Sequence, residues 1–75
     1  MIENGEFIPR KLTEREQINL ALRMSQFNNV NSLVLSRNNI QLRLNEAKFL
    51  EIENEIADAQ VMAKVLEKAI KFCLH

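Results

Sequence analysis

The sequence predicts a small α+β domain with an N-terminal helix, a β-hairpin and a long C-terminal helix, assembled as a homo-oligomer. Three observations lead to this fold class. A capping-box pattern precedes the first apolar segment, apolar and polar residues then alternate, and residues 46–74 carry a heptad-like repeat without Gly or Pro. A chain of 75 residues has the length of one domain. We expect residues 1–12 to form an irregular arm and residues 13–75 to form the folded unit.

The first helix is expected to begin directly after Thr13. Thr13 and Glu16 have the spacing of a capping box, in which each side chain satisfies a free backbone N–H group at a helix start. Apolar side chains then cover most of the helical surface of residues 14–27, so this helix needs neighbours on two sides. The segment 28–32 is rich in Asn and Ser, whose side chains compete for backbone hydrogen bonds and therefore favour an end to the helix.

A β-hairpin is predicted over residues 33–44, because apolar residues there recur at every second position. Asn38 and Asn39 would form its two-residue turn, since Asn tolerates the positive φ of a type I′ turn. This register places the leucines of both strands on one face. The pairs across the hairpin would be Leu35 with Leu42 and Leu33 with Leu44.

A long helix is predicted from Glu46 to about Leu74, either continuous or broken near Asp58, with Asn45 as its N-cap. Apolar residues in this segment are separated by alternating intervals of three and four, which is the repeat of a coiled-coil seam. A chain this short buries a limited core, so we expect the seam to be the interface of a homo-oligomer, most simply a dimer. The expected interface residues are Phe49, Ile52, Ile56, Ala59, Ala63, Leu66, Ile70 and Cys73.

The composition argues against several classes of function. Ten basic residues balance ten acidic ones, so the chain lacks the positive charge that drives non-specific binding to nucleic acids. A single Cys and a single His supply neither an internal disulfide nor a set of metal ligands, and no Gly-rich phosphate loop is present. We therefore expect no catalytic, cofactor-binding or metal-binding residues and no enzymatic activity. The lack of a long apolar segment and of a signal-like N-terminus predicts a cytoplasmic protein without a membrane partner.

These features favour a non-enzymatic, homo-oligomeric binding protein, interpreted as a small bacterial or phage regulator or inhibitor that acts on a protein partner. One alternative is a sponge or sensor for a small ligand such as a nucleotide, held between subunits by Arg15, Arg23 or Arg43. A structural part of a larger assembly is another alternative. All three functions would use a surface between chains.

A further alternative comes from the segment 39–45. Polar and apolar residues alternate from residue 39 to residue 44, and Asn45 and a helical segment follow, which resembles the ribbon and first helix of ribbon-helix-helix repressors. In that family a dimeric two-stranded ribbon places polar side chains in the major groove of DNA. The resemblance covers residues 39–74 and implies that Leu42 and Leu44 lie in the dimer core. The residues that would contact base edges are Asn39, Gln41 and Arg43.

Overall fold

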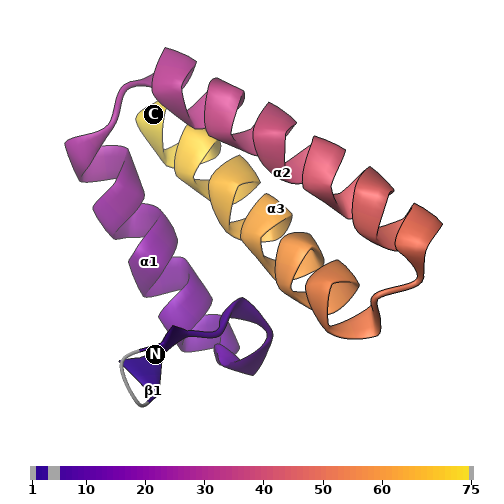
Figure 1. The fold of residues 1–75 in the computed structure, drawn as a ribbon. Helices are drawn as coiled ribbons and strands as arrows, with labels where there is room; N and C mark the ends of the chain where they lie inside the picture. Colours follow the sequence, from indigo (N-terminus) through magenta and orange to yellow (C-terminus); the bar gives the residue numbers. More distant parts are fainter. Residues whose placement is uncertain (1, 4–5, 75) are drawn as a thin grey trace.

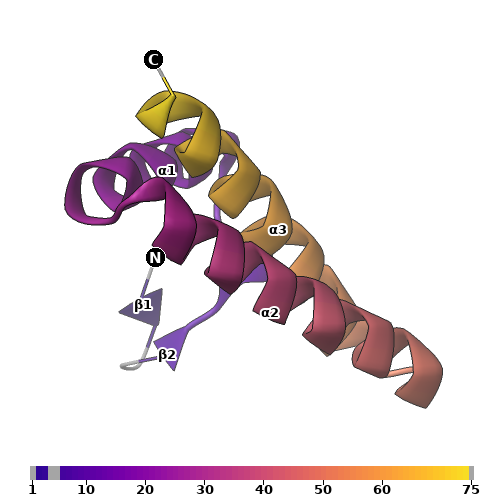
Figure 2. The ribbon, with the colours of Figure 1, turned by 90° about the horizontal axis from the view of Figure 1, so that it is seen from above.

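The computed structural model describes residues 2, 3 and 6–74, and within them the chain forms a bundle of the α-helices α1 (Glu14–Phe27), α2 (Val30–Leu50) and α3 (Glu53–Cys73). Helix α3 lies between α1 and α2 and packs against both of them (Figure 1). The arm before α1 contains the strands β1 (Ile2–Glu3) and β2 (Glu6–Phe7), which pair antiparallel (Figure 2). The arm then continues as the 3-10 helix η1 (Pro9–Lys11).

The predicted start of the first helix is confirmed. The backbone N–H of Glu16 donates a hydrogen bond to Thr13 Oγ1 at 3.2 Å, and the backbone N–H of Thr13 donates to Glu16 Oε1 at 3.0 Å. Helix α1 ends at Phe27, and the polar segment after it is a short junction, because Asn29 already caps α2 by accepting a hydrogen bond from the Ser32 N–H at 2.8 Å.

The capping box makes a pH-dependent prediction. The Thr13 backbone and then its side chain hydrogen-bond the Glu16 carboxylate and hold the pKa of Glu16 below its ordinary value of 4.5. The charged form is favoured in the folded state, so its stabilisation is present above pH 4.5 and is lost as the pH falls through the lowered pKa. Glu16→Gln keeps a hydrogen-bond acceptor but cannot titrate. The variant should therefore be less stable than the parent at neutral pH, and this difference in stability should shrink in acid. A Glu16 carboxyl that titrates by NMR at its ordinary pKa would contradict this expectation.

The predicted α+β fold class is wrong, because residues 33–44 belong to α2 rather than to a β-hairpin. Residues two positions apart lie about 200° apart around a helix. Leu33 is therefore buried, at 2% exposed, whereas Leu35 is 64% exposed on the other side of α2. Leu44 is likewise buried and Leu42 exposed. The alternation that resembles a strand arises from two opposite apolar faces of one helix.

The predicted long helix is also wrong as a single element, and the break lies earlier than Asp58. Helix α2 ends at Leu50, Glu51 takes left-handed backbone angles (φ 58°, ψ 38°), and Asp58 lies inside α3. The Glu51 N–H donates to the Lys48 carbonyl at 3.2 Å and the Ile52 N–H to the Ala47 carbonyl at 3.0 Å, which is the pattern of a Schellman motif. Asn45, predicted as an N-cap, lies within α2.

The left-handed conformation of Glu51 yields a stability prediction. A side chain with a Cβ is disfavoured there, and Gly is the usual residue at this position of a Schellman motif. Glu51→Gly should therefore raise the free energy of unfolding by about 0.5–1 kcal/mol. Glu51→Ala is the matched control, because it removes the charge but keeps the Cβ. If the two variants are equally stable in urea denaturation, the left-handed backbone of residue 51 is not the cause of any gain in stability.

The core lies where α3 meets the other two helices. It consists of Ala21 from α1, Leu33 from α2, and Val65, Leu66 and Ala69 from α3, each at most 2% exposed. Among the described residues, the largest fully buried side chains are Leu33, Leu66 and Val65. A core this small leaves several large apolar side chains on the surface.

Candidate interaction surface

Three exposed apolar side chains form a stripe along α2, on the face opposite α3. Leu35, Leu42 and Phe49 are 64%, 66% and 87% exposed and recur every seven residues. At about 100° per residue they lie within about 40° of one another around the helix axis. The inner face of α2, which carries Leu33, Leu44 and Ala47, packs on α3 and leaves this stripe uncovered by the described part of the chain.

Asparagines occupy the positions between the apolar residues of the stripe. Asn31, Asn38 and Asn45 are exposed, and together with the stripe they follow alternating intervals of four and three. The Gln41 side chain donates a hydrogen bond through Nε2 to Asn45 Oδ1 at 3.2 Å, so the amide nitrogen of Asn45 keeps both of its N–H groups for other acceptors. We call this set the outer seam of α2: Asn31, Leu35, Asn38, Leu42, Asn45 and Phe49.

The sequence-based prediction does not include the outer seam, although its heptad spacing is present in the sequence. The alternation of residues 33–44 also fits two strands, and the heptad repeat of the predicted long helix begins only at Phe49. Two heptad patterns overlap in α2, one for each face. The signal that finds the second is the spacing of the two leucines and one phenylalanine at intervals of seven.

The apolar surface continues around the α2–α3 turn. Leu50 is 53% exposed and Ile52 is 39% exposed, next to Phe49 at the end of α2. Glu51 has a left-handed backbone, and Ile52 occupies the N-cap of α3 without a side-chain hydrogen bond. A chain selected only for stability would favour Gly and a capping residue at these positions. Such departures from local preference concentrate at functional sites.

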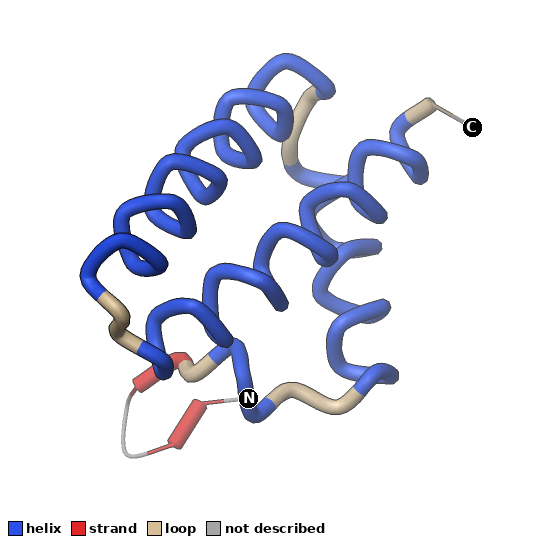
Figure 3. The backbone as a smooth tube through the Cα atoms, turned by 90° about the vertical axis from the view of Figure 1, so that its right-hand side faces the viewer, coloured by secondary structure: helices blue, strands red, loops and turns tan. Residues whose placement is uncertain are grey.

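The N-terminal arm is fixed to α3 by Arg10 and Asp58. The Arg10 backbone N–H donates to Asp58 Oδ1 at 2.9 Å, and the guanidinium Nη1 donates to Oδ2 at 3.0 Å. Figure 3 shows the arm at the end of the bundle that carries the α2–α3 turn. Leu12, which follows η1, is buried and completes this attachment.

The contribution of this attachment can be separated into two parts. Asp58→Ala removes both hydrogen bonds and should lower the free energy of unfolding by about 1–2 kcal/mol, since both side chains are partly exposed. Arg10→Ala keeps the backbone N–H bond and should cost about half as much. Urea denaturation measures both changes. An effect of Arg10→Ala as large as that of Asp58→Ala would contradict the role assigned to the backbone bond.

Two open grooves lie beside α3. The first, of roughly 600 Å³, lies between the arm, α2 and α3, and its charged lining residues are Arg43, Glu46, Glu55 and Asp58. The second, of roughly 350 Å³, lies between α1 and α3 and is lined by Lys64, Lys68, Lys71, Glu14 and Glu67 among others. No polar or charged side chain among the described residues is buried, so neither groove presents an enclosed polar group that would select a ligand.

The predicted interface residues occupy two different environments. Phe49 and Ile52 are exposed at the α2–α3 turn. The other six lie on α3, where Ala59 and Leu66 are buried within their own chain, and where Ile56, Ala63, Ile70 and Cys73 are half-buried. Cys73 Sγ lies 3.5 Å from the carbonyl oxygen of Ser25 and 3.8 Å from that of Asn28, and the two oxygens share its single S–H donor. A homo-oligomer through these eight residues stays a prediction.

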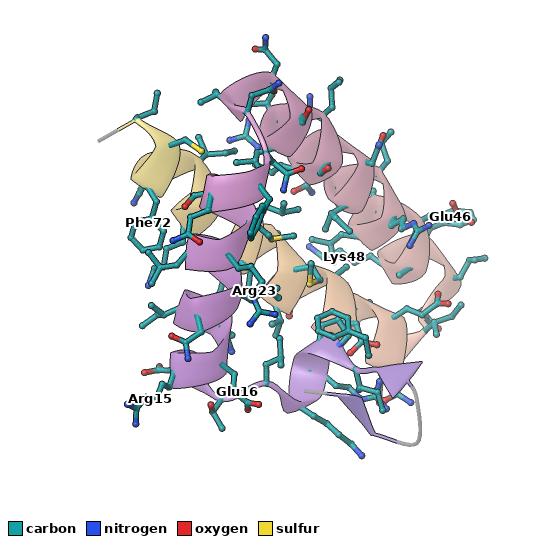
Figure 4. All side chains as sticks on the ribbon, turned by 90° about the vertical axis from the view of Figure 1, so that its left-hand side faces the viewer. Arg15, Glu16, Arg23, Glu46, Lys48 and Phe72 are labelled. Carbon is teal, nitrogen blue, oxygen red and sulfur yellow. The ribbon has the colours of Figure 1, made fainter. Side chains whose placement is uncertain are left out.

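The residues of the two alternative functions are not brought together as expected. Residues 39–44, where the ribbon-helix-helix alternative needs a strand, are helical, so the resemblance does not extend to the fold; Asn39, Gln41 and Arg43 are exposed on α2. Arg15 and Arg23 project from α1 (Figure 4). Arg43 lines the first groove, and neither Arg15 nor Arg23 lines either groove.

Comparison with known proteins adds no relative: no protein-family model matches the chain, and no curated protein or solved structure is significantly similar to it. Within residues 2, 3 and 6–74, no helix has the length and apolar character required to cross a bilayer. In the same residues, no three or more His, Cys, Asp or Glu side chains gather as metal ligands would.

Proposed function

We propose that this protein is a non-enzymatic binding protein that engages protein partners through the outer seam of α2. The observation that supports this proposal is the stripe of Leu35, Leu42 and Phe49, each more than 60% exposed on a face that the described part of the chain leaves uncovered. Isolated exposed apolar residues are common, whereas an aligned group next to further apolar residues at the α2–α3 turn is typical of an interaction surface.

The shape of the surface favours a protein over a small molecule. The outer seam spans residues 31–49 and is about 27 Å long at 1.5 Å per residue. It is the convex side of a helix, whereas small ligands are usually held in concave sites. Helical partners recognise such a surface through anchors at heptad spacing, and the asparagines supply directional hydrogen bonds between the anchors. A regulator or inhibitor would act by packing the outer seam against a helix of its partner, which would cover that helix.

A pair of substitutions tests this function. Leu42→Lys places a charge at the centre of the outer seam, while Leu74→Lys places the same charge on a side chain of similar exposure, 71% against 66%, outside the seam. Immobilised parent protein and both variants are compared for capture of proteins from a lysate that also contains untagged copies of this chain. We expect the parent and Leu74→Lys to capture the same protein and Leu42→Lys to lose it. After purification, the captured protein should bind directly to the parent. The proposal fails if no captured protein, this chain included, depends on Leu42.

A further inference from the structure

We infer that the outer seam of α2 is covered by a second copy of this chain, in a parallel and in-register two-stranded coiled coil formed by two α2 helices. This inference rests on the proposed function and names its partner. It differs from an assembly through the segment 49–73, because six of the eight interface residues expected there are already buried or half-buried within one chain.

The spacing of the outer seam assigns its residues to heptad positions. In a heptad the step from a to d is three residues and the step from d to the next a is four. Leu35, Leu42 and Phe49 therefore occupy a positions. The asparagines at 31, 38 and 45 occupy d positions, so every apolar level of the seam is followed by an amide level.

This order of levels is complementary to itself in one orientation. In a parallel, in-register pair, each a residue faces the same a residue and each d residue faces the same d residue, so Leu meets Leu and Asn meets Asn. A carboxamide both donates and accepts, so two facing asparagines satisfy each other. An antiparallel pair would place Leu against Asn and leave buried amides without partners. A partner of another sequence would need amides at the same three levels.

The geometry at Asn45 prepares this amide for pairing. Its Oδ1 accepts from Gln41 within the same helix, which leaves its N–H₂ group and one lone pair of the oxygen available for further hydrogen bonds. Gln41 and Glu46 lie at flanking g and e positions, where the Gln41 amide of one copy approaches the Glu46 carboxylate of the second copy. Glu46 projects from the exposed part of α2 (Figure 4).

The rest of the fold permits this arrangement. Helix α2 lies at the side of the bundle, with α3 and α1 beyond its inner face (Figure 1), so a second copy can approach along its whole length. In a parallel pair both α2–α3 turns lie at the same end. The exposed Phe49, Leu50 and Ile52 of the two copies would then be close together and would shield one another from water.

Sedimentation equilibrium at micromolar concentrations tests the association. The parent is expected to form a species of twice the 8.7 kDa chain mass. Leu42→Lys should weaken the dimer by about tenfold or more, while its circular dichroism spectrum stays that of the parent, and Leu74→Lys should change neither property. A dimer that persists in Leu42→Lys would overturn the inference and favour the interface predicted within residues 49–73.

Disulfide trapping tests the orientation. Asn31→Cys and Asn45→Cys are each made in a Cys73→Ser background and oxidised. The two positions are about 21 Å apart along α2, so both variants can form covalent dimers only if the helices are parallel and in register. A covalent dimer from one variant or from neither would overturn this arrangement.

The oligomeric state and the capture experiment together separate this inference from the proposed function. If the parent is monomeric but still captures another protein through Leu42, the inference fails and the proposed function stands. If Leu42-dependent capture is also absent, both fail.

Discussion

Leu33→Ala should lower the free energy of unfolding by about 2–5 kcal/mol, because Leu33 is 2% exposed in the core between α2 and α3. Leu35→Ala, two residues away on the same helix, should change the free energy by no more than about 0.5 kcal/mol, because Leu35 is 64% exposed. Urea denaturation followed by circular dichroism measures both values. Protein concentrations should be low enough that the midpoint no longer depends on concentration, so that association does not contribute.

This pair of variants distinguishes a helix with two apolar faces from the predicted hairpin. A hairpin with its turn at Asn38 and Asn39 would place Leu33 and Leu35 on the same buried face, and both substitutions would then be costly. Similar losses of stability in the two variants would therefore contradict the helical arrangement of α2.

Asn39→Pro should destabilise the protein by about 3 kcal/mol or more, since residue 39 lies in the middle of α2. Proline removes one i to i−4 hydrogen bond of the helix, and its ring collides with the preceding turn. Asn39→Ala is the control, because it should raise the stability by a few tenths of a kcal/mol through helix propensity. Thermal denaturation followed at a helical wavelength gives both changes.

Asn39→Gly supplies the opposite test at the same position. In a helix, glycine is less favourable than asparagine, so the variant should be less stable than the parent. In a type I′ turn, the resulting Asn-Gly sequence would be more favourable than Asn-Asn. A glycine variant that exceeds the parent in stability would support the hairpin and not α2.

Helix α1 could be predicted from the sequence because its start is encoded locally. Thr13 and Glu16 form the capping box that the spacing indicates, and the predicted bounds of 14–27 match the structure. Helix α2 could not be predicted in the same way. Its apolar residues are divided between an inner face and the outer seam, which lie on opposite sides of the helix. The sequence of α2 therefore lacks the single apolar stripe that identifies an amphipathic helix.

The α2–α3 turn lacked a recognisable signal for a different reason. Chain reversals after a helix usually carry Gly or Pro, and this one carries Glu51 in the left-handed region with Ile52 after it. The heptad-like repeat from Phe49 to Cys73 also continues across the turn, which favoured one helix where the structure has two. Its residues on α3 are buried or half-buried within one chain, and the residues of the outer seam share one face only if residues 30–50 are helical.

The short turn at Glu51 and Ile52 also has a consequence for the order of folding. Helices α2 and α3 are adjacent in the chain, so their contacts close small loops at a low entropic cost. Contacts of α1 with α3 must close a loop that contains all of α2. Local contacts form early in folding, so the antiparallel pair of α2 and α3 should assemble before α1 docks. The outer seam would then be present on an intermediate in which the α1-facing side of α3 is still open to solvent.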